Sequence, residues 1–247
     1  MQRDPAVSAL AAAWGGAAVF AASLVWFVYC YLVRFDTLDA AIAVPTNTSA
    51  FLWPAGVDVL MFSVFALHHS VFARSSARAY VLAAVPAHVE RSLYTWIASV
   101  LFLIVCTLWQ PVPGTLYRLA GPWRTVAYAV QLLGLLLTVH ASRKLDVLDL
   151  AGVRPVQRAV RGDPPDHVPL ETRGIYGFVR HPLYFAWAVF VFAAPDMTAT
   201  RAVFAIASTA YLAIAIPWEE RALIATFGDA YRAYQRSVRW RMVPGLY

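Results

Sequence analysis

Long apolar runs dominate this chain of 247 residues, and they constrain its fold more than any other feature. A helix needs about 20 mostly apolar residues to cross a bilayer core of about 30 Å. Four runs of this kind lie at 12–33, 53–73, 92–109 and 123–140, and two shorter runs follow at 182–194 and 202–218. Because 60% of the residues are hydrophobic and only 14% are charged, a soluble globular domain is disfavoured. We therefore predict an all-α, polytopic membrane bundle of about six helices.

The first apolar run is preceded by a single arginine, Arg3. It is longer than the about 7 to 15 apolar residues of a secretory signal, so we expect it to be retained as a membrane helix. Cys30 and Cys106 both lie in apolar runs and lack a metal-ligand spacing, which favours packing roles.

The distribution of basic residues predicts how the helices are oriented. Of the 20 Lys and Arg residues, four lie in segments that would face outwards if the N-terminus were cytoplasmic: Arg34, Arg118, Arg124 and Arg201. The other 16 lie in inward-facing segments, as the positive-inside rule requires. We therefore expect both termini in the cytoplasm. The net charge of +6 follows from this pattern, with lipid headgroups as counter-charge, and needs no nucleic-acid partner.

A polar segment, 141–180, divides the chain into an N-terminal four-helix membrane region, 1–140, and a second region, 141–247. We expect this segment to extend the fourth helix, to break near Gly152 and to stay non-helical around the Asp-Pro-Pro-Asp at 163–166. The fifth apolar run is short and ends before Pro195. We therefore expect the last two membrane helices to form a hairpin that is tilted or spans the bilayer incompletely.

A charged cluster lies where the fifth run begins. Proline is favoured at the first position of a helix, so Pro182 predicts a helix start with His181 at the cap. Tyr184, three residues after His181, falls on the same face, and the N–H groups of the helix N-terminus could meet a ligand carboxylate. The alternative is an ordinary membrane boundary: Arg180 as an anchor, Pro182 as a start signal, and Tyr176 and Tyr184 in the interfacial aromatic belt.

A second cluster follows the sixth run, where Glu219 and Glu220 succeed a long apolar stretch. Acidic residues at a membrane edge are costly and suggest function, unless the helix ends at 218 and leaves them in water. Gly228 is expected to stop the helix, with Asp229 capping an amphipathic helix on the membrane surface. Its apolar side would carry Tyr231, Tyr234 and Val238.

The two clusters share a pattern with known enzymes. G-x-Y-x-x-x-R-H-P-x-Y, ending at Tyr184, and E-E-x-x-L-x-x-x-F-G-x-x-Y-x-x-Y, beginning at Glu219, resemble the integral-membrane methyltransferases over about residues 168–247. These include isoprenylcysteine carboxyl, phospholipid N- and methanethiol S-methyltransferases. The resemblance implies S-adenosyl-L-methionine bound at the cytoplasmic side of the last two helices. It also implies that the cofactor contacts Tyr176, His181, Pro182, Leu183, Tyr184 and Glu219.

The absence of one arginine disfavours some candidate methyl acceptors relative to others. Isoprenylcysteine methyltransferases carry an arginine about one turn before the glutamates, and the position near Ala215 has none. The stretches FALHHSVFAR, VERSLYTW and LWQPVPGTLY are similar to those of methanethiol S-methyltransferases and related bacterial proteins. We therefore expect a multi-pass protein of a bacterial inner membrane that methylates a small lipophilic thiol. Isoprenylcysteine or phospholipid methylation, and a non-catalytic membrane protein, are the alternatives.

His69 is the candidate catalytic residue. It shares a helix face with Asp58, eleven residues earlier, and lies at the expected cytoplasmic end of its helix. A thiol acceptor must lose a proton, which a neutral histidine can take. His68, His88 and His140 fit packing or interface positions better. The sequence has no metal signature, and we expect the small acceptor and membrane lipids as partners, with no protein partner evident.

Overall fold

The computed structural model describes residues 5–40, 48–72, 85–164 and 169–247. This part of the chain is nearly all helical, and five helices are long and apolar enough to cross a membrane. They cover Ala6–Leu38, Ser49–Phe72, Ala87–Leu108, Gly121–Ser142 and Ala199–Phe227, with a shorter apolar helix at Pro182–Phe192. The prediction of a mainly helical, multi-pass membrane protein is confirmed. Some residues used in the predictions lie outside the described part of the chain. These are the basic residues Arg3, Arg74 and Arg78, and Asp166 of the Asp-Pro-Pro-Asp stretch.

The chain forms two compact units that interleave in sequence. Unit 1 comprises Met1–Thr37, Leu60–Trp109 and Leu145–His167, and unit 2 comprises Leu38–Val59, Gln110–Lys144 and Val168–Tyr247. Helix α3 (Ser49–Phe72) contributes residues to both units.

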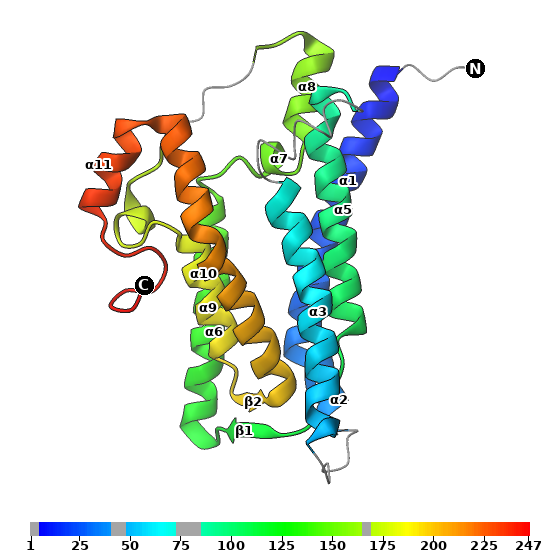
Figure 1. Ribbon diagram of the computed structural model, residues 1–247, viewed down its shortest axis with the longest axis vertical. Helices are drawn as coiled ribbons and strands as arrows, with labels where there is room; N and C mark the ends of the chain where they lie inside the picture. Colours follow the sequence, from blue (N-terminus) through cyan, green and yellow to red (C-terminus); the bar gives the residue numbers. More distant parts are fainter. Residues whose placement is uncertain (1–4, 41–47, 73–84, 165–168) are drawn as a thin grey trace. The chain divides into compact units, whose positions relative to one another are not determined.

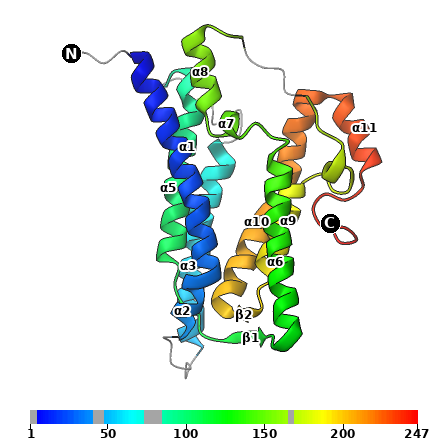
Figure 2. The same cartoon turned by 180° about the vertical axis from the view of Figure 1, so that it is seen from behind.

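Unit 1 is built on the packing of α1 (Pro5–Tyr29) against α5 (Ala87–Leu108), which lie side by side in both views (Figures 1 and 2). Two glycines of α1, Gly15 and Gly16, allow this close approach, because a Cβ on either would lie 2.9 Å from the ring of Trp96. A π-helical turn (Cys30–Arg34) and α2 (Phe35–Ala40) continue α1. Cys30 and Cys106 are fully buried, as packing residues are.

The polar segment after α6 (Gly121–Ser142) differs from its prediction. Instead of extending α6 towards Gly152, the chain leaves the helix at Ser142 and forms α7 (Val147–Leu150) and α8 (Val153–Arg161). The side chain of Asp146 caps α7 by accepting from two backbone N–H groups at 3.1 Å. Gly152, with φ +80°, makes the predicted break, and a Cβ there would lie 2.6 Å from the Cα atom of Ser92.

Helix α8 was not predicted, although its sequence explains it. Val153 and Val156 are one turn apart and fully buried, and they pack against Ala13 of α1. The arginines of α8 lie on its other sides. A helix of only nine residues with one narrow apolar stripe depends on this contact for stability, so the sequence alone indicates it weakly.

In unit 2, α6, α9 (Pro182–Phe192) and α10 (Ala199–Phe227) pack together, with α9 in contact with both neighbours (Figures 1 and 2). One end is closed by the antiparallel strands β1 (Thr115–Arg118) and β2 (Asp196–Thr198), which follow α5 and α9. Asp196 of β2 forms an ion pair of 2.8 Å with Arg124 of α6. These contacts position α9, whose other end begins with the R-H-P motif.

Helix α10 does not end at residue 218. It has 29 residues and passes through Glu219 and Glu220 to Phe227. At 1.5 Å per residue, Glu219 lies about 30 Å from Ala199 along the axis, which is about the thickness of a bilayer core. The acids therefore belong to a continuous helix that is long enough to span a bilayer core before it reaches them.

A 3₁₀ turn (Gly174–Gly177), α11 (Asp229–Ser237) and the C-terminal segment 238–247 gather at this end of α10. Gly228 stops α10 as predicted, and it also takes the cap position of α11 that was assigned to Asp229. The apolar face of α11, expected on the membrane, instead packs against the protein. Tyr231, Tyr234 and Val238 are buried against Leu170, Tyr176, Leu223, Ile224 and Phe227.

Candidate functional site

The start of α9 is fixed by backbone contacts around His181. The His181 carbonyl accepts from the N–H groups of Tyr184 and Phe185, each at 3.1 Å, and the His181 N–H donates to the carbonyl of Arg241 at 2.8 Å. Pro182 is buried at the first helical position and has no N–H group. The amides of His181, Tyr184 and Phe185 are therefore engaged within the protein. These bonds occupy part of the helix N-terminus, and its contact with a ligand carboxylate stays a prediction.

Three side chains meet on one side of this helix start. The rings of His181 and Tyr184 stack with centroids 5.4 Å apart and an interplanar angle of 11°. The Tyr184 hydroxyl donates to the carboxylate of Glu219 on α10, and His181 Nδ1 lies 3.4 Å from another oxygen of the same carboxylate. The Glu219 side chain is 42% exposed, so it can also meet a ligand.

Glu220 faces the interior and is only 3% exposed. Its carboxylate accepts from Arg180 Nε at 2.6 Å and Gln235 Nε2 at 3.1 Å, and it lies 3.4 Å from Arg241 Nε. We call Arg180, His181, Tyr184, Glu219 and Glu220 the carboxylate cluster.

Sequence reasoning missed two members of this cluster. Glu220 was not selected as a site residue, and Arg180 was weighed as a surface anchor, whereas its side chain is only 7% exposed. Two consecutive acids and an arginine beside the candidate histidine were the available signals. Their pairing was hidden because the partners are 40 residues apart.

His181 lies between the two acids, with Nε2 3.6 Å from Glu220 Oε1. Burial alone would lower the pKa of His181, but the contacts with Glu219 and Glu220 outweigh burial and raise that pKa above 6.5. The ring therefore keeps its proton to a higher pH than a free histidine. The cluster combines two carboxylates with the cations of Arg180 and protonated His181, which suits a ligand carrying charges of both signs.

Tyr176 belongs to a neighbouring cluster. Its ring packs against Tyr231, Tyr234 and Val238, and its carbonyl accepts from the Tyr234 hydroxyl at 2.7 Å. Burial raises the pKa of both Tyr231 and Tyr234, with a further contribution from the negative charge of Glu220. The buried Tyr231 hydroxyl has no hydrogen-bond partner among the described residues. Leu183, the remaining predicted contact residue, is half-buried on α9.

His69 lies on α3, in the part of this helix that belongs to unit 1. Its Nδ1 atom is 2.7 Å from the hydroxyl of Tyr94, which also lies 3.3 Å from the His69 carbonyl oxygen. The ring stacks on Phe65 with centroids 5.7 Å apart. If the Tyr94 hydroxyl donates to the carbonyl, Nδ1 carries the ring proton and Nε2 is the basic nitrogen.

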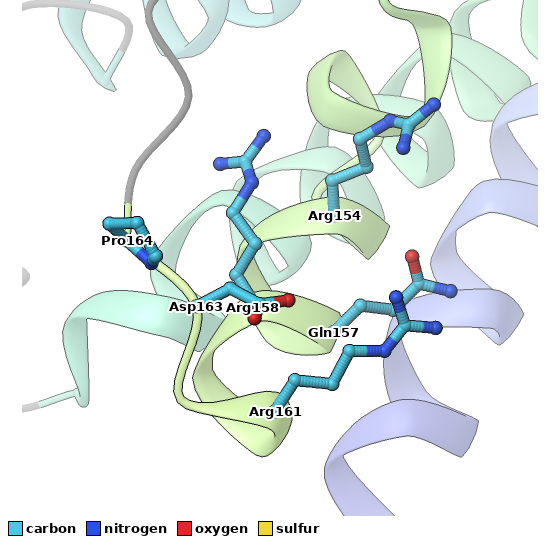
Figure 3. Close-up of a pocket in the computed structure, with 6 residues that line it drawn as sticks. All are labelled: Arg154, Gln157, Arg158, Arg161, Asp163 and Pro164. Atoms are coloured by element: carbon cyan, nitrogen blue, oxygen red, sulfur yellow. The ribbon is translucent and has the colours of Figure 1, made fainter.

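A separate hollow of about 350 Å³ lies on α8 (Figure 3). It is lined by Arg154, Gln157, Arg158, Arg161, Asp163 and Pro164. Arg154 is paired with Asp146, and Arg158 Nη2 lies 2.8 Å from Asp149 Oδ1. These pairs and Asp163 balance the three arginines, so we assign no ligand to this hollow.

Comparisons with known proteins point to one family. The family model described as "Protein of unknown function (DUF1295)" matches residues 74–238. A methanethiol S-methyltransferase from Mycobacterium tuberculosis is 34% identical over 229 residues, covering 90% of this chain and 92% of the relative. Methanethiol S-methyltransferase 2 from Bradyrhizobium diazoefficiens is 34% identical over 203 residues, covering 82% of this chain and 77% of the relative.

A more distant similarity covers less of the chain. A protein-S-isoprenylcysteine O-methyltransferase from Dictyostelium discoideum is 38% identical over 85 residues, covering 33% of this chain and 35% of the relative. No solved structure matches the chain. The similarities confirm an enzyme with methyltransferase activity, and they place this chain in the DUF1295 family, among the integral-membrane methyltransferases.

Proposed function

We propose that the protein transfers a methyl group from S-adenosyl-L-methionine to a small lipophilic thiol, with methanethiol as the first candidate. The observation that carries this proposal is the extent of the similarity: relatives named for methanethiol methylation align with up to 90% of the chain. The isoprenylcysteine relative aligns with only a third of it. The lack of an arginine near Ala215 also disfavours a carboxylate acceptor.

The carboxylate cluster suits this methyl donor. Glu219 is half exposed and can accept from ribose hydroxyls or an ammonium group, while protonated His181 can pair with a carboxylate. Tyr184 orients Glu219 by donating to it. We assign donor contacts to Tyr176, His181, Pro182, Leu183, Tyr184 and Glu219. When bound, S-adenosyl-L-methionine supplies a methyl group on a positively charged sulfur, leaving S-adenosylhomocysteine.

The acceptor requires one further step from the protein, because a thiolate is a far better nucleophile than a thiol. The acceptor sulfur forms the new bond to the methyl carbon, and its proton passes to a base. We propose Nε2 of His69 as this base, since Tyr94 occupies Nδ1. The rest of the rate acceleration comes from holding the two reactants in line and away from water.

We further propose how the protein lies in a bacterial inner membrane. Both termini face the cytoplasm, residues 1–140 form a membrane region of four helices, and residues 141–247 form the methyltransferase region. Helices α9 and α10 act as a hairpin that presents the carboxylate cluster at the cytoplasmic side. The charge distribution supports this orientation, since 16 of 20 basic residues fall on the inward side.

A methyl-transfer screen tests the proposed function. Purified protein in micelles is incubated with methyl-labelled S-adenosyl-L-methionine and methanethiol, an isoprenylcysteine analogue or phosphatidylethanolamine. Label should pass to methanethiol and form dimethyl sulfide. Transfer to either of the other acceptors alone would replace the thiol assignment. If calorimetry detects no binding of S-adenosylhomocysteine, the protein is a non-catalytic relative.

A further inference from the structure

Glu220 has no role in the proposed chemistry, yet both of its oxygens are engaged. Arg180 Nε and His181 Nε2 lie 2.6 and 3.6 Å from Oε1, and Gln235 Nε2 and Arg241 Nε lie 3.1 and 3.4 Å from Oε2. The residue is only 3% exposed. Burying a carboxylate costs several kcal/mol of desolvation free energy unless partners compensate its charge. The partners of Glu220 come from three separate segments: the start of α9, α11 and the C-terminal segment.

The same contacts extend to the C-terminal segment. Arg180 Nη1 donates to the carbonyls of Val238 and Arg239, at 2.6 and 3.0 Å, and the Arg180 N–H donates to the carbonyl of Trp240 at 2.9 Å. With the bond from the His181 N–H to Arg241, residues 180–181 are paired to residues 238–241. The side chains of Arg180 and Arg241 both contact the Glu220 carboxylate. This one carboxylate therefore links the two paired segments, 180–181 and 238–241.

We propose that Glu220 is a positioning residue of the methyl-donor site, whose carboxylate fixes the His181 ring and clamps the segment Val238–Arg241 through Arg180 and Arg241. The inference rests on the proposed function for the identity of the ligand. Glu219 contacts the donor directly, whereas Glu220 acts through His181. The two adjacent acids of α10 thus have different tasks because they point in different directions.

The charge of His181 gives this role a measurable consequence. The charged groups around the ring are Glu219 and Glu220 of α10, Arg180 next to it and Arg241 of the C-terminal segment, with Tyr184 stacked on it. Glu220 is one of the two acids that raise the pKa of His181 against the opposing effect of burial. Protonated His181 stabilises the fold fully below the unfolded pKa of about 6.5, and this contribution is lost as pH rises through the folded pKa.

Glu220→Gln tests the proposal, because it keeps the shape of the side chain and removes its charge. The ring signals of His181 are followed against pH by NMR in micelles, without ligand, and assigned with His181→Gln. The midpoint should fall by about one pH unit or more, the usual effect of an adjacent opposite charge. Asp229→Asn is the matched control: its side chain is 96% exposed beyond the end of α10, and it should leave the midpoint unchanged.

A second variant separates positioning from stability. Glu220→Gln leaves Arg180 buried without its carboxylate, which lowers the unfolding temperature. Arg180→Gln combined with Glu220→Gln removes both charges but also the bonds from Arg180 to the carbonyls of Val238 and Arg239, so the unfolding temperature should recover in part while the His181 midpoint stays below the wild-type value. If the His181 midpoint of the double variant returned to the wild-type value together with the unfolding temperature, Glu220 would have only a structural role. An unchanged midpoint in both variants would overturn the proposal.

Binding of S-adenosylhomocysteine to the same samples links the inference to the site. Glu220→Gln should weaken binding about tenfold at a pH above the His181 midpoints of both proteins, and much less at a pH below both midpoints, where His181 is protonated in each. An equal loss at both pH values would contradict positioning through His181. If the wild type does not bind, the proposed function fails, and the His181 titration still decides whether Glu220 acts on this ring.

Discussion

Glu219 and Glu220 show how far a residue type predicts a role. Their position after an apolar run indicated function, because acids at a membrane edge are costly. Successive residues of a helix point in different directions, so one carboxylate meets Tyr184 and solvent while the other meets Arg180 and Gln235. The sequence could not assign these environments, since Gln235 and Arg180 are 15 and 40 residues away from Glu220.

Glu219→Ala should weaken binding of S-adenosylhomocysteine about tenfold, measured by calorimetry. A hydrogen bond to a charged group contributes about 1.5 to 3 kcal/mol, and the lower end applies because the side chain is 42% exposed. Asp229→Asn serves again as the control, with an expected dissociation constant equal to that of the wild type. An unchanged dissociation constant for Glu219→Ala would remove this residue from the site.

His69→Ala should lower transfer to a thiol by about 10²- to 10⁴-fold, the usual effect of losing a general base, while donor affinity stays the same. Raising the pH should partly rescue the variant, since a cysteine-like thiol ionises with a pKa of about 8.5. The measurement is a rate profile against pH. His140→Ala, which removes an exposed histidine of α6, is the control.

The base assignment has a clear alternative. A carboxylate acceptor is already ionised at neutral pH, so neither the loss nor the rescue should occur with it. A His69→Ala protein that binds donor normally and turns over at the wild-type rate across the pH range would refute His69 as the base.

At the scale of elements, hydropathy predicted the long helices and failed at their ends. All six apolar runs overlap helices, because a run of this length in a membrane satisfies its backbone only by folding helically. The apolar run itself ends at 218, however, and only Gly228 indicated that α10 continues to Phe227. Hydropathy also missed α8, whose burial depends on two valines and on a partner far away in sequence.

Close packing of α6 on α9 depends on Gly134. A Cβ at this position would lie 2.7 Å from the backbone N atom of Phe190, so Gly134→Ala should force the helices apart. Overpacking of this kind costs about 1 to 3 kcal/mol, which should appear as a lower unfolding temperature in detergent. Gly56→Ala is the matched control within a helix, because a Cβ at Gly56 would meet no atom within 4 Å. This change should leave the free energy of unfolding unchanged or raise it by about 0.5 to 1 kcal/mol. Equal stability of the two variants would contradict this contact.

At the scale of the whole molecule, composition determined the class of protein, and the basic residues predict its orientation. Only Arg34, Arg118, Arg124 and Arg201 oppose the expected topology. Three of them have partners in the structure: Arg124 forms an ion pair with Asp196, Arg34 donates to the Cys106 carbonyl, and Arg201 donates to the Asp196 carbonyl. These three arginines therefore have structural contacts that explain their position on the outward side. They weaken the prediction from the positive-inside rule less than their number suggests.

Cysteine labelling in intact cells tests the orientation. Single cysteines are introduced by Asp163→Cys after α8, Asp229→Cys at the start of α11 and Leu116→Cys in β1, all at exposed positions. A membrane-impermeant maleimide should label only Leu116→Cys, because the positive-inside rule places the other two in the cytoplasm. The wild-type chain should stay unlabelled throughout, since Cys30 and Cys106 are fully buried. After permeabilisation all three variants should react. Labelling of Asp163→Cys or Asp229→Cys from outside would reverse the topology and move the carboxylate cluster away from the cytoplasmic supply of methyl donor.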